Sequence, residues 1–262
     1  MKIVLTHSEG RFDGLAEGLR RRGHEVVHAP LIVTRPRSGE DARADASELL
    51  ALPWLLFTSR SAVEAWAVLG VGWTAPDGHA PRLGAVGRQT ASALRKQGAE
   101  PALVAERSSR AAGLAEAFLE HPAAAGPVGL PQGDRARPTL RRALEEMGFE
   151  TRPLVLYETV TQPWTGEAEG SERPGAGGAT ELIVLASPSA AEALPGEVAR
   201  RATLVAIGPT TAAALEHRGL PCRQASTPSV GGVLAEVDAV LAEPGGAGPD
   251  ESGAVGDEGG RS

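Results

Sequence analysis

The sequence predicts an α/β protein built from two similar, flavodoxin-like domains, each with a parallel sheet covered by helices. Three observations support this prediction. Apolar runs of strand length alternate with helical stripes along the chain. A strand–turn–helix unit occurs twice, at residues 83–98 (LGAVGRQTASALRKQG) and 204–219 (LVAIGPTTAAALEHRG). A second repeat relates residues 57–66 (FTSRSAVEAW) to residues 185–194 (LASPSAAEAL), in the same order along the chain.

The first elements are expected to be a strand, a helix and a second strand. Residues 2–6 (KIVLT) suit a strand, and a helical stripe from Phe12 to Leu19 ends at Gly23. Glu25–His28 is the second strand, and residues 37–45 form a polar stretch after Pro36. Further strands are predicted at residues 54–58, 102–105, 128–131, 151–160 and 182–185 and near Cys222, and further helices at residues 59–69, 111–119, 138–147, 190–194 and 230–237.

These elements repeat as a βαβ unit followed by a βαβαβα unit. The two βαβ units align Leu15 with Leu140, Leu19 with Leu144, Gly23 with Gly148 and Glu25 with Glu150. Each longer unit could complete its sheet with the βαβ unit before it or with the other one. Extended runs at residues 29–33 and 153–159 suit two crossings between domains, which the second arrangement requires. Sheets of this kind bind ligands at the carboxyl ends of their strands.

Composition limits the class of partner. The 262 residues are 42% hydrophobic, enough for real cores, and the net charge of −7 argues against bulk nucleic-acid binding. The single Cys222 cannot form an intrachain disulfide and fits a reducing cytosol. The sequence shows neither a secretion signal nor a long apolar run, so we expect no membrane span. Arginines cluster at Arg135, Arg137, Arg141 and Arg142, which suits an anionic small molecule.

Hydroxyl side chains follow the predicted strands at both copies of each repeat. Helix N-caps and contacts with a bound anion are compatible roles for these hydroxyls, and the sequence leaves both open. The five residues concerned are Ser59, Ser187, Thr90, Thr210 and Thr211. Neighbouring positions expected to contact the same ligand are Thr58, Arg60, Ser61, Gly87, Arg88, Arg137, Ser189 and Pro209, and the alternative for the arginines is a solvated surface role.

Residues 24–28 (HEVVH) match the zinc-protease pattern and offer a second function class. That chemistry needs His24 and His28 on one face of a helix, with Glu25 as the base. The valines favour a strand instead, where the two histidines would lie about 13 Å apart, too far for one zinc ion. We therefore expect no metal site. A non-catalytic ligand-binding module on the same fold is a third alternative.

Five segments in order resemble the uroporphyrinogen-III synthase family: FTSRSAVEAW, VGRQTASAL, VLYET, SPSAAEAL and IGPTTAAALEHRG. The resemblance covers most of the chain, from Ile3 to about Leu241. It implies a lyase that cyclises hydroxymethylbilane, with loss of water and inversion of ring D, and that needs no cofactor or metal. It also implies a catalytic role for Tyr157, the only tyrosine, whose phenol would assist loss of the ring A hydroxyl. An aromatic that only packs the connector is the alternative for Tyr157.

The resemblance also implies how the chain is divided. Two domains would be joined by a two-stranded connector, with chain swapped between them. The expected bounds are residues 1–30 plus 180–243 for a discontinuous domain 1, 38–152 for domain 2, 30–37 and 153–161 for the connectors, 162–179 for a flexible insert and 244–262 for a disordered tail. The resemblance further implies a monomer that binds a polyanionic tetrapyrrole and can receive it transiently from hydroxymethylbilane synthase. Composition adds the expectation of a cytoplasmic location, no nucleic-acid partner and no membrane partner.

Overall fold

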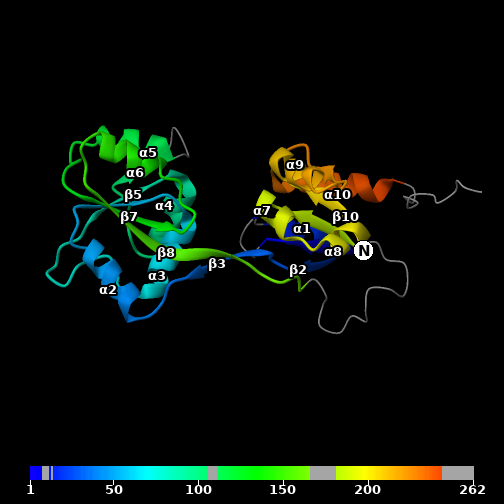
Figure 1. The fold of residues 1–262 in the computed structure, drawn as a ribbon, viewed down its shortest axis with the longest axis horizontal. Coiled ribbons are helices and arrows are strands. Elements are labelled where there is room, and N and C mark those ends of the chain that lie inside the picture. Colours follow the sequence, from blue (N-terminus) through cyan, green and yellow to red (C-terminus); the bar gives the residue numbers. More distant parts are fainter. Residues whose placement is uncertain (8–11, 13, 106–110, 166–180, 244–262) are drawn as a thin grey trace, which may run out of the picture. The chain divides into compact units, whose positions relative to one another are not determined.

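The computed structural model describes residues 1–7, 12, 14–105, 111–165 and 181–243 (Figure 1). The predicted tail at 244–262 and most of the predicted insert at 162–179 lie outside these residues. The chain forms two compact units. Unit 1 comprises Met1–Leu31 and the chain from Pro163 onward, and unit 2 comprises Ile32–Gln162.

Unit 1 holds a five-stranded parallel sheet in the order β11-β10-β9-β1-β2. Its strands are β1 (Lys2–Leu5), β2 (Glu25–His28), β9 (Leu182–Leu185), β10 (Thr203–Ala206) and β11 (Arg223–Gln224). Its helices are α1 (Leu15–Arg21), α7 (Pro188–Ala193), α8 (Gly196–Arg201), α9 (Pro209–His217) and α10 (Val230–Ala242). The central strand β9 is apolar throughout (LIVL) because both faces of the sheet are covered. Side chains of α1 and α10 pack on one face, and α7 packs against α9.

Unit 2 holds a six-stranded sheet in the order β3-β8-β7-β4-β5-β6. Its strands are β3 (Ile32–Pro36), β4 (Trp54–Phe57), β5 (Arg82–Ala85), β6 (Leu103–Val104), β7 (Val128–Gly133) and β8 (Thr151–Thr161). Its helices are α2 (Glu40–Leu49), α3 (Arg60–Leu69), α4 (Gly87–Lys96), α5 (Ala111–Leu119) and α6 (Thr139–Glu146). Helices α2, α3 and α4 bury one face of the sheet, and α5 and α6 bury the other (Figure 1). β3 pairs antiparallel with the second half of β8, and the other pairs are parallel.

The two sheets share one strand order. Unit 1 reads β2-β1-β9-β10-β11, and unit 2 reads β8-β7-β4-β5-β6 beside the extra β3. In both, a βαβ unit forms one side, and β7–α6–β8 takes the place of β1–α1–β2. Ile3 of β1 pairs with Leu182 of β9. The N-terminal βαβ unit therefore completes its sheet with the later strands β9, β10 and β11. The predicted flavodoxin-like parallel-sheet fold is therefore confirmed, and of the two pairings left open the second is correct.

Two helices were not predicted. α2 lies partly in the stretch described as polar, because its buried stripe consists of Ala42, Ala46 and Leu49. Alanine side chains give a weak apolar signal, although they fill a close helix–sheet contact. The short α8 follows Pro195 and buries only Ala199, so its sequence also carries little periodicity.

Candidate active site

The parallel strands of unit 2 end together at one edge of its sheet. β4 ends at Phe57, β5 at Ala85 and β7 at Gly133, and β4 pairs in parallel with both neighbours. β8 runs parallel to β7 and continues past this edge to Thr161. Because doubly wound sheets bind ligands at the carboxyl ends of their strands, the turns after β4, β5 and β7 are the first candidates for function.

Ser59 and Tyr157 meet at this edge. Ser59 is the N-cap of α3, and its Oγ accepts a hydrogen bond from the Ala62 backbone N–H at 3.1 Å. The phenol oxygen of Tyr157, on β8, lies 3.3 Å from the same Oγ. The Tyr157 ring is partly buried against the core under α2, α3 and α4. A serine fixed by a helix start thus holds the one phenol of the chain at the sheet edge.

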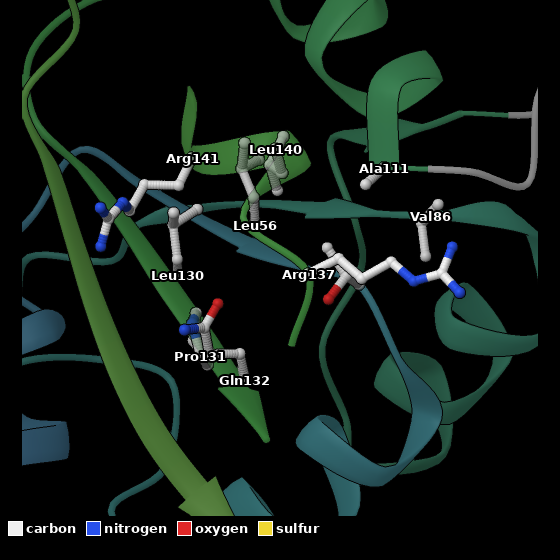
Figure 2. Close-up of a pocket in the computed structure, with 10 residues that line it drawn as sticks. Leu56, Val86, Ala111, Leu130, Pro131, Gln132, Arg137, Leu140 and Arg141 are labelled. Carbon is white, nitrogen blue, oxygen red and sulfur yellow. The ribbon is translucent and has the colours of Figure 1, made fainter. Parts of the chain in front are cut away.

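A pocket of about 160 Å³ opens at the same edge, on the face covered by α5 and α6 (Figure 2). Its apolar floor contains Leu56 of β4 and Leu130 of β7, and Thr58 lines it directly before Ser59 in the chain. Arg137 and Arg141 lie on opposite sides of the pocket, with Arg137 extending toward Val86 (Figure 2). The remaining lining residues are Ala111, Pro131, Gln132 and Leu140. An apolar floor with two guanidinium groups suits an organic carboxylate.

The other predicted positions of unit 2 lie on α3 and α4. Arg60 pairs with Glu64 one turn along α3, at 3.2 Å, and Ser61 is partly buried on the same helix. Gly87 is the first residue of α4 and has a φ of 75°, a conformation that favours glycine. Arg88 follows on the exposed side of the first turn.

Unit 1 repeats the corner geometry. Ser187 is the N-cap of α7 and accepts a hydrogen bond from the Ala190 N–H at 3.2 Å. Its Oγ also lies 3.1 Å from Ser189 Oγ, so both predicted serines belong to one hydroxyl pair. At the start of α9, Pro209 and Thr210 are exposed.

Of the two roles that the sequence left open for Thr90, Thr210 and Thr211, the N-cap role is not the one that the structure shows. Gly208 occupies the cap position of α9, so Thr210 and Thr211 lie inside the first turn. α4 begins after Val86, which places Thr90 a full turn into that helix. Thr90 and Thr211 are buried, with exposed fractions of 3% and 1%. Gly208 caps α9 and Gly87 is the first residue of α4, so both helices begin before their threonines.

The HEVVH segment forms a strand, as its valines predict. Glu25–His28 is β2, and the His28 Nδ1 lies 3.4 Å from the His7 carbonyl oxygen. The zinc-protease arrangement requires both histidines on one helical turn, which β2 does not provide. Within the described part of the chain, no three His, Cys, Asp or Glu side chains are grouped so that they could hold a metal ion.

The family model described as uroporphyrinogen-III synthase HemD matches residues 13–235 of this chain. The chain belongs to the uroporphyrinogen-III synthase family. The match includes every strand of unit 2 and all strands of unit 1 except β1, and it includes the Ser59–Tyr157 contact and the pocket of unit 2. The enzymes of this family are cyclising lyases, which confirms the enzyme class that the sequence motifs predicted.

Solved structures of synthases from two bacteria share the fold. A Helicobacter pylori uroporphyrinogen-III synthetase is 19% identical, with a TM-score of 0.56, and the match covers 92% of this chain and 99% of that one. A mutant uroporphyrinogen III synthase from Thermus thermophilus is also 19% identical, with a TM-score of 0.52, covering 93% of this chain and 100% of that one. No helix in the described ranges has the length and apolar character needed to cross a membrane.

The structure adds residues to the site that the sequence left aside. Gln132 and Arg141 line the pocket although neither was among the expected ligand contacts. Arg141 belonged to the arginine cluster around the β7–α6 turn, so a signal for it was present. Gln132 carried no signal, because an isolated polar residue at a strand end has many structural roles.

Proposed function

We propose that this chain converts hydroxymethylbilane into uroporphyrinogen III, with Tyr157 as the catalytic residue. Hydroxymethylbilane is a linear tetrapyrrole with eight carboxylates. In the reaction ring A loses its hydroxyl as water, and ring D attacks the resulting cation through a spiro intermediate that recloses with ring D inverted. Family membership supports the overall reaction. The observation that supports Tyr157 is its 3.3 Å contact with the capping Ser59 at the carboxyl edge of the sheet.

The Ser59 contact can leave the phenol hydrogen available to substrate, since either hydroxyl can be the donor. Ser59 Oγ already accepts the Ala62 N–H, and a serine hydroxyl has one hydrogen to donate. When Ser59 donates that hydrogen to Tyr157, the phenol O–H is free to hydrogen-bond the departing ring A hydroxyl. The phenol oxygen then remains close to the cation that the loss of water leaves behind.

We further propose that the carboxylates are held by many modest contacts. Each hydrogen bond to a charged group is worth about 1.5–3 kcal/mol, so a few of them position the substrate for the inverted closure. In unit 2 the proposed contacts are Thr58, Ser59, Arg60, Ser61, Gly87, Arg88 and Arg137. In unit 1 they are Ser187, Ser189, Pro209 and Thr210. Because Thr90 and Thr211 are buried, we infer that they stabilise these turns and do not contact the substrate with their side chains.

We infer that units 1 and 2 act as the two domains of a cytoplasmic monomer that needs no metal or cofactor. The lone Cys222 supports a reducing location. The unstable substrate favours direct hand-over from hydroxymethylbilane synthase.

The deciding experiment incubates the protein with freshly made hydroxymethylbilane and separates the type I and type III products. Type III product above the spontaneous type I background supports the proposal. Tight binding of the bilane without a change in isomer ratio would instead favour a non-catalytic binding module. Tyr157→Phe keeps the ring and removes only the hydroxyl, and we expect turnover to fall by about 10²–10⁴-fold. If Tyr157→Phe keeps more than about half of the turnover, Tyr157 is not the proton donor and positioning alone carries the reaction.

A further inference from the structure

The strand that carries Tyr157 has an irregularity at the residue before it. Gln132 of β7 pairs with Val155 of β8, but the next residue, Gly133, pairs with Tyr157, so Leu156 is the extra residue of a β-bulge. In a regular strand, neighbouring side chains point to opposite faces of the sheet. Here Leu156 belongs to the core cluster under α2, α3 and α4, and Tyr157 packs against the same cluster. The bulge therefore turns two consecutive side chains to one face.

Hydrogen bonds hold the backbone on both sides of this bulge. The Arg37 N–H donates to the Leu156 carbonyl at 2.7 Å from the side of β3. The Asp134 N–H donates to the Tyr157 carbonyl at 3.0 Å from the side of β7. Since both neighbouring strands fix the peptide groups of residues 156 and 157, the direction of the tyrosine side chain is set by the sheet.

The turned phenol lies directly on the backbone of Gly133. A β-carbon added to Gly133 would lie 2.5 Å from Cε2 and 2.7 Å from Oη of Tyr157, and it would also overlap Cζ. Real β-carbons do not approach other heavy atoms so closely. Gly133 has no positive φ, so its backbone conformation does not require glycine. The Tyr157 ring occupies the space that a side chain at position 133 would need.

We propose that Gly133 is a positioning residue for Tyr157, and this inference rests on the function proposed above. Because Gly133 has no side chain, the phenol can lie across the end of β7 and reach Ser59 Oγ. Any side chain at position 133 pushes the ring away from Ser59 and from the place where the ring A hydroxyl departs. Gly133 touches no reacting atom in this scheme and acts only through Tyr157.

The test uses the fact that the chain contains a single tyrosine. Protein labelled with 3-fluorotyrosine gives one fluorine NMR signal, which reports the surroundings of Tyr157 without substrate. We expect Gly133→Ala to shift this signal and to lower the turnover to type III product about tenfold or more, with a smaller change in KM.

Gly129→Ala is the matched control. Gly129 lies on the same strand, and a β-carbon there would overlap Leu55 and lie 3.2 Å from Leu52, with no contact to Tyr157. It should therefore lower stability while the fluorotyrosine signal and the turnover of the folded protein stay unchanged. An unmoved signal in Gly133→Ala, or an equal shift in both variants, overturns the inference.

Two further variants keep the test decisive if Gly133→Ala folds poorly. In a Tyr157→Ala background the ring is absent, so adding Gly133→Ala should cost no further stability. If the double variant is less stable than Tyr157→Ala alone, the overlap is not with the ring and the inference fails. In a Tyr157→Phe background, adding Gly133→Ala should lower turnover little further, because both act through the same hydroxyl.

Failure of the proposed function has a different outcome. If the wild-type protein makes no type III product, the proposed function is refuted, and the fluorine signal still tests the placement of Tyr157.

Discussion

Replacing Ser59 by alanine separates its two roles, capping α3 and holding Tyr157. Loss of the N-cap bond to the Ala62 N–H should cost about 1 kcal/mol of stability. The hydroxyl contact with Tyr157 is 3.3 Å long, well beyond the usual 2.7–2.8 Å of an O–H···O bond, so it adds little to stability. The total loss should therefore stay near that of a simple cap. Turnover should fall by no more than about fivefold, because about 1 kcal/mol, the energy of one ordinary hydrogen bond, is the upper limit for this long contact with the phenol.

Ser229→Ala is the control for this measurement. Ser229 caps α10, and its Oγ accepts the Gly232 N–H at 3.1 Å, the same length as the Ser59 cap bond. It also has one hydroxyl neighbour, Thr227 Oγ1, at 2.9 Å. Denaturant unfolding followed by circular dichroism gives both stability losses, and the isomer assay gives both turnovers. Equal turnover in the two variants would refute the orienting role of Ser59. A stability loss for Ser59→Ala more than about 1.5 kcal/mol above that of Ser229→Ala would show that the phenol contact is strong.

Three other outcomes follow from single positions. Gly232→Ala should destabilise the protein by about 1–3 kcal/mol, since the new methyl group would overlap Thr227. Gly231→Ala meets open space and should stabilise the protein by about 0.5 kcal/mol, so the two variants should shift the denaturant midpoint in opposite directions. The pKa of the Cys222 thiol is raised by burial and by the nearby Glu216 carboxylate, so less thiolate is present at neutral pH. A thiol reagent should therefore react with Cys222 more slowly than with glutathione, and an equal or faster rate would contradict the pKa shift. Because His24 and His28 are not on a helical turn, elemental analysis of the purified protein should find no stoichiometric zinc, and chelator should leave type III formation intact.

The sequence predicted the fold well because its information was periodic and repeated. Strands such as β9 are continuous apolar runs, and the paired corner units indicated two sheets of the same kind. The helix α2 was missed since its buried face is mostly alanine. Pattern alone could not determine which βαβ unit joins which sheet. That depends on the pairing of Ile3 with Leu182, a contact between opposite ends of the sequence.

The site was only partly predictable, for a similar reason. Ser59 and Tyr157 were both named from local motifs, but their contact depends on the bulge at Leu156, which leaves no mark in the sequence. Gly133 lies beyond the strand predicted at residues 128–131, and its importance depends on the ring of Tyr157 from the neighbouring strand. Thr90, Thr210 and Thr211 lie two to four residues after the caps, which are Val86 in α4 and Gly208 in α9, because a short motif does not fix the residue at which a helix begins.

The strand order of unit 1 also has a consequence for biosynthesis. β1 pairs with β2 on one side and with β9 on the other, and β9 is made long after both. At about 5–20 residues per second, the ribosome needs roughly 10–30 s to synthesise the roughly 150 residues between β2 and β9. During this time the whole of unit 2 is synthesised as one continuous segment, Ile32–Gln162. The N-terminal βαβ unit meanwhile has an open strand edge on β1, which is a template for aggregation until β9 arrives. Nascent chains should therefore depend on chaperones most strongly at the βαβ unit of β1 and β2, which is synthesised before β9 and completes its sheet only when β9 pairs with it.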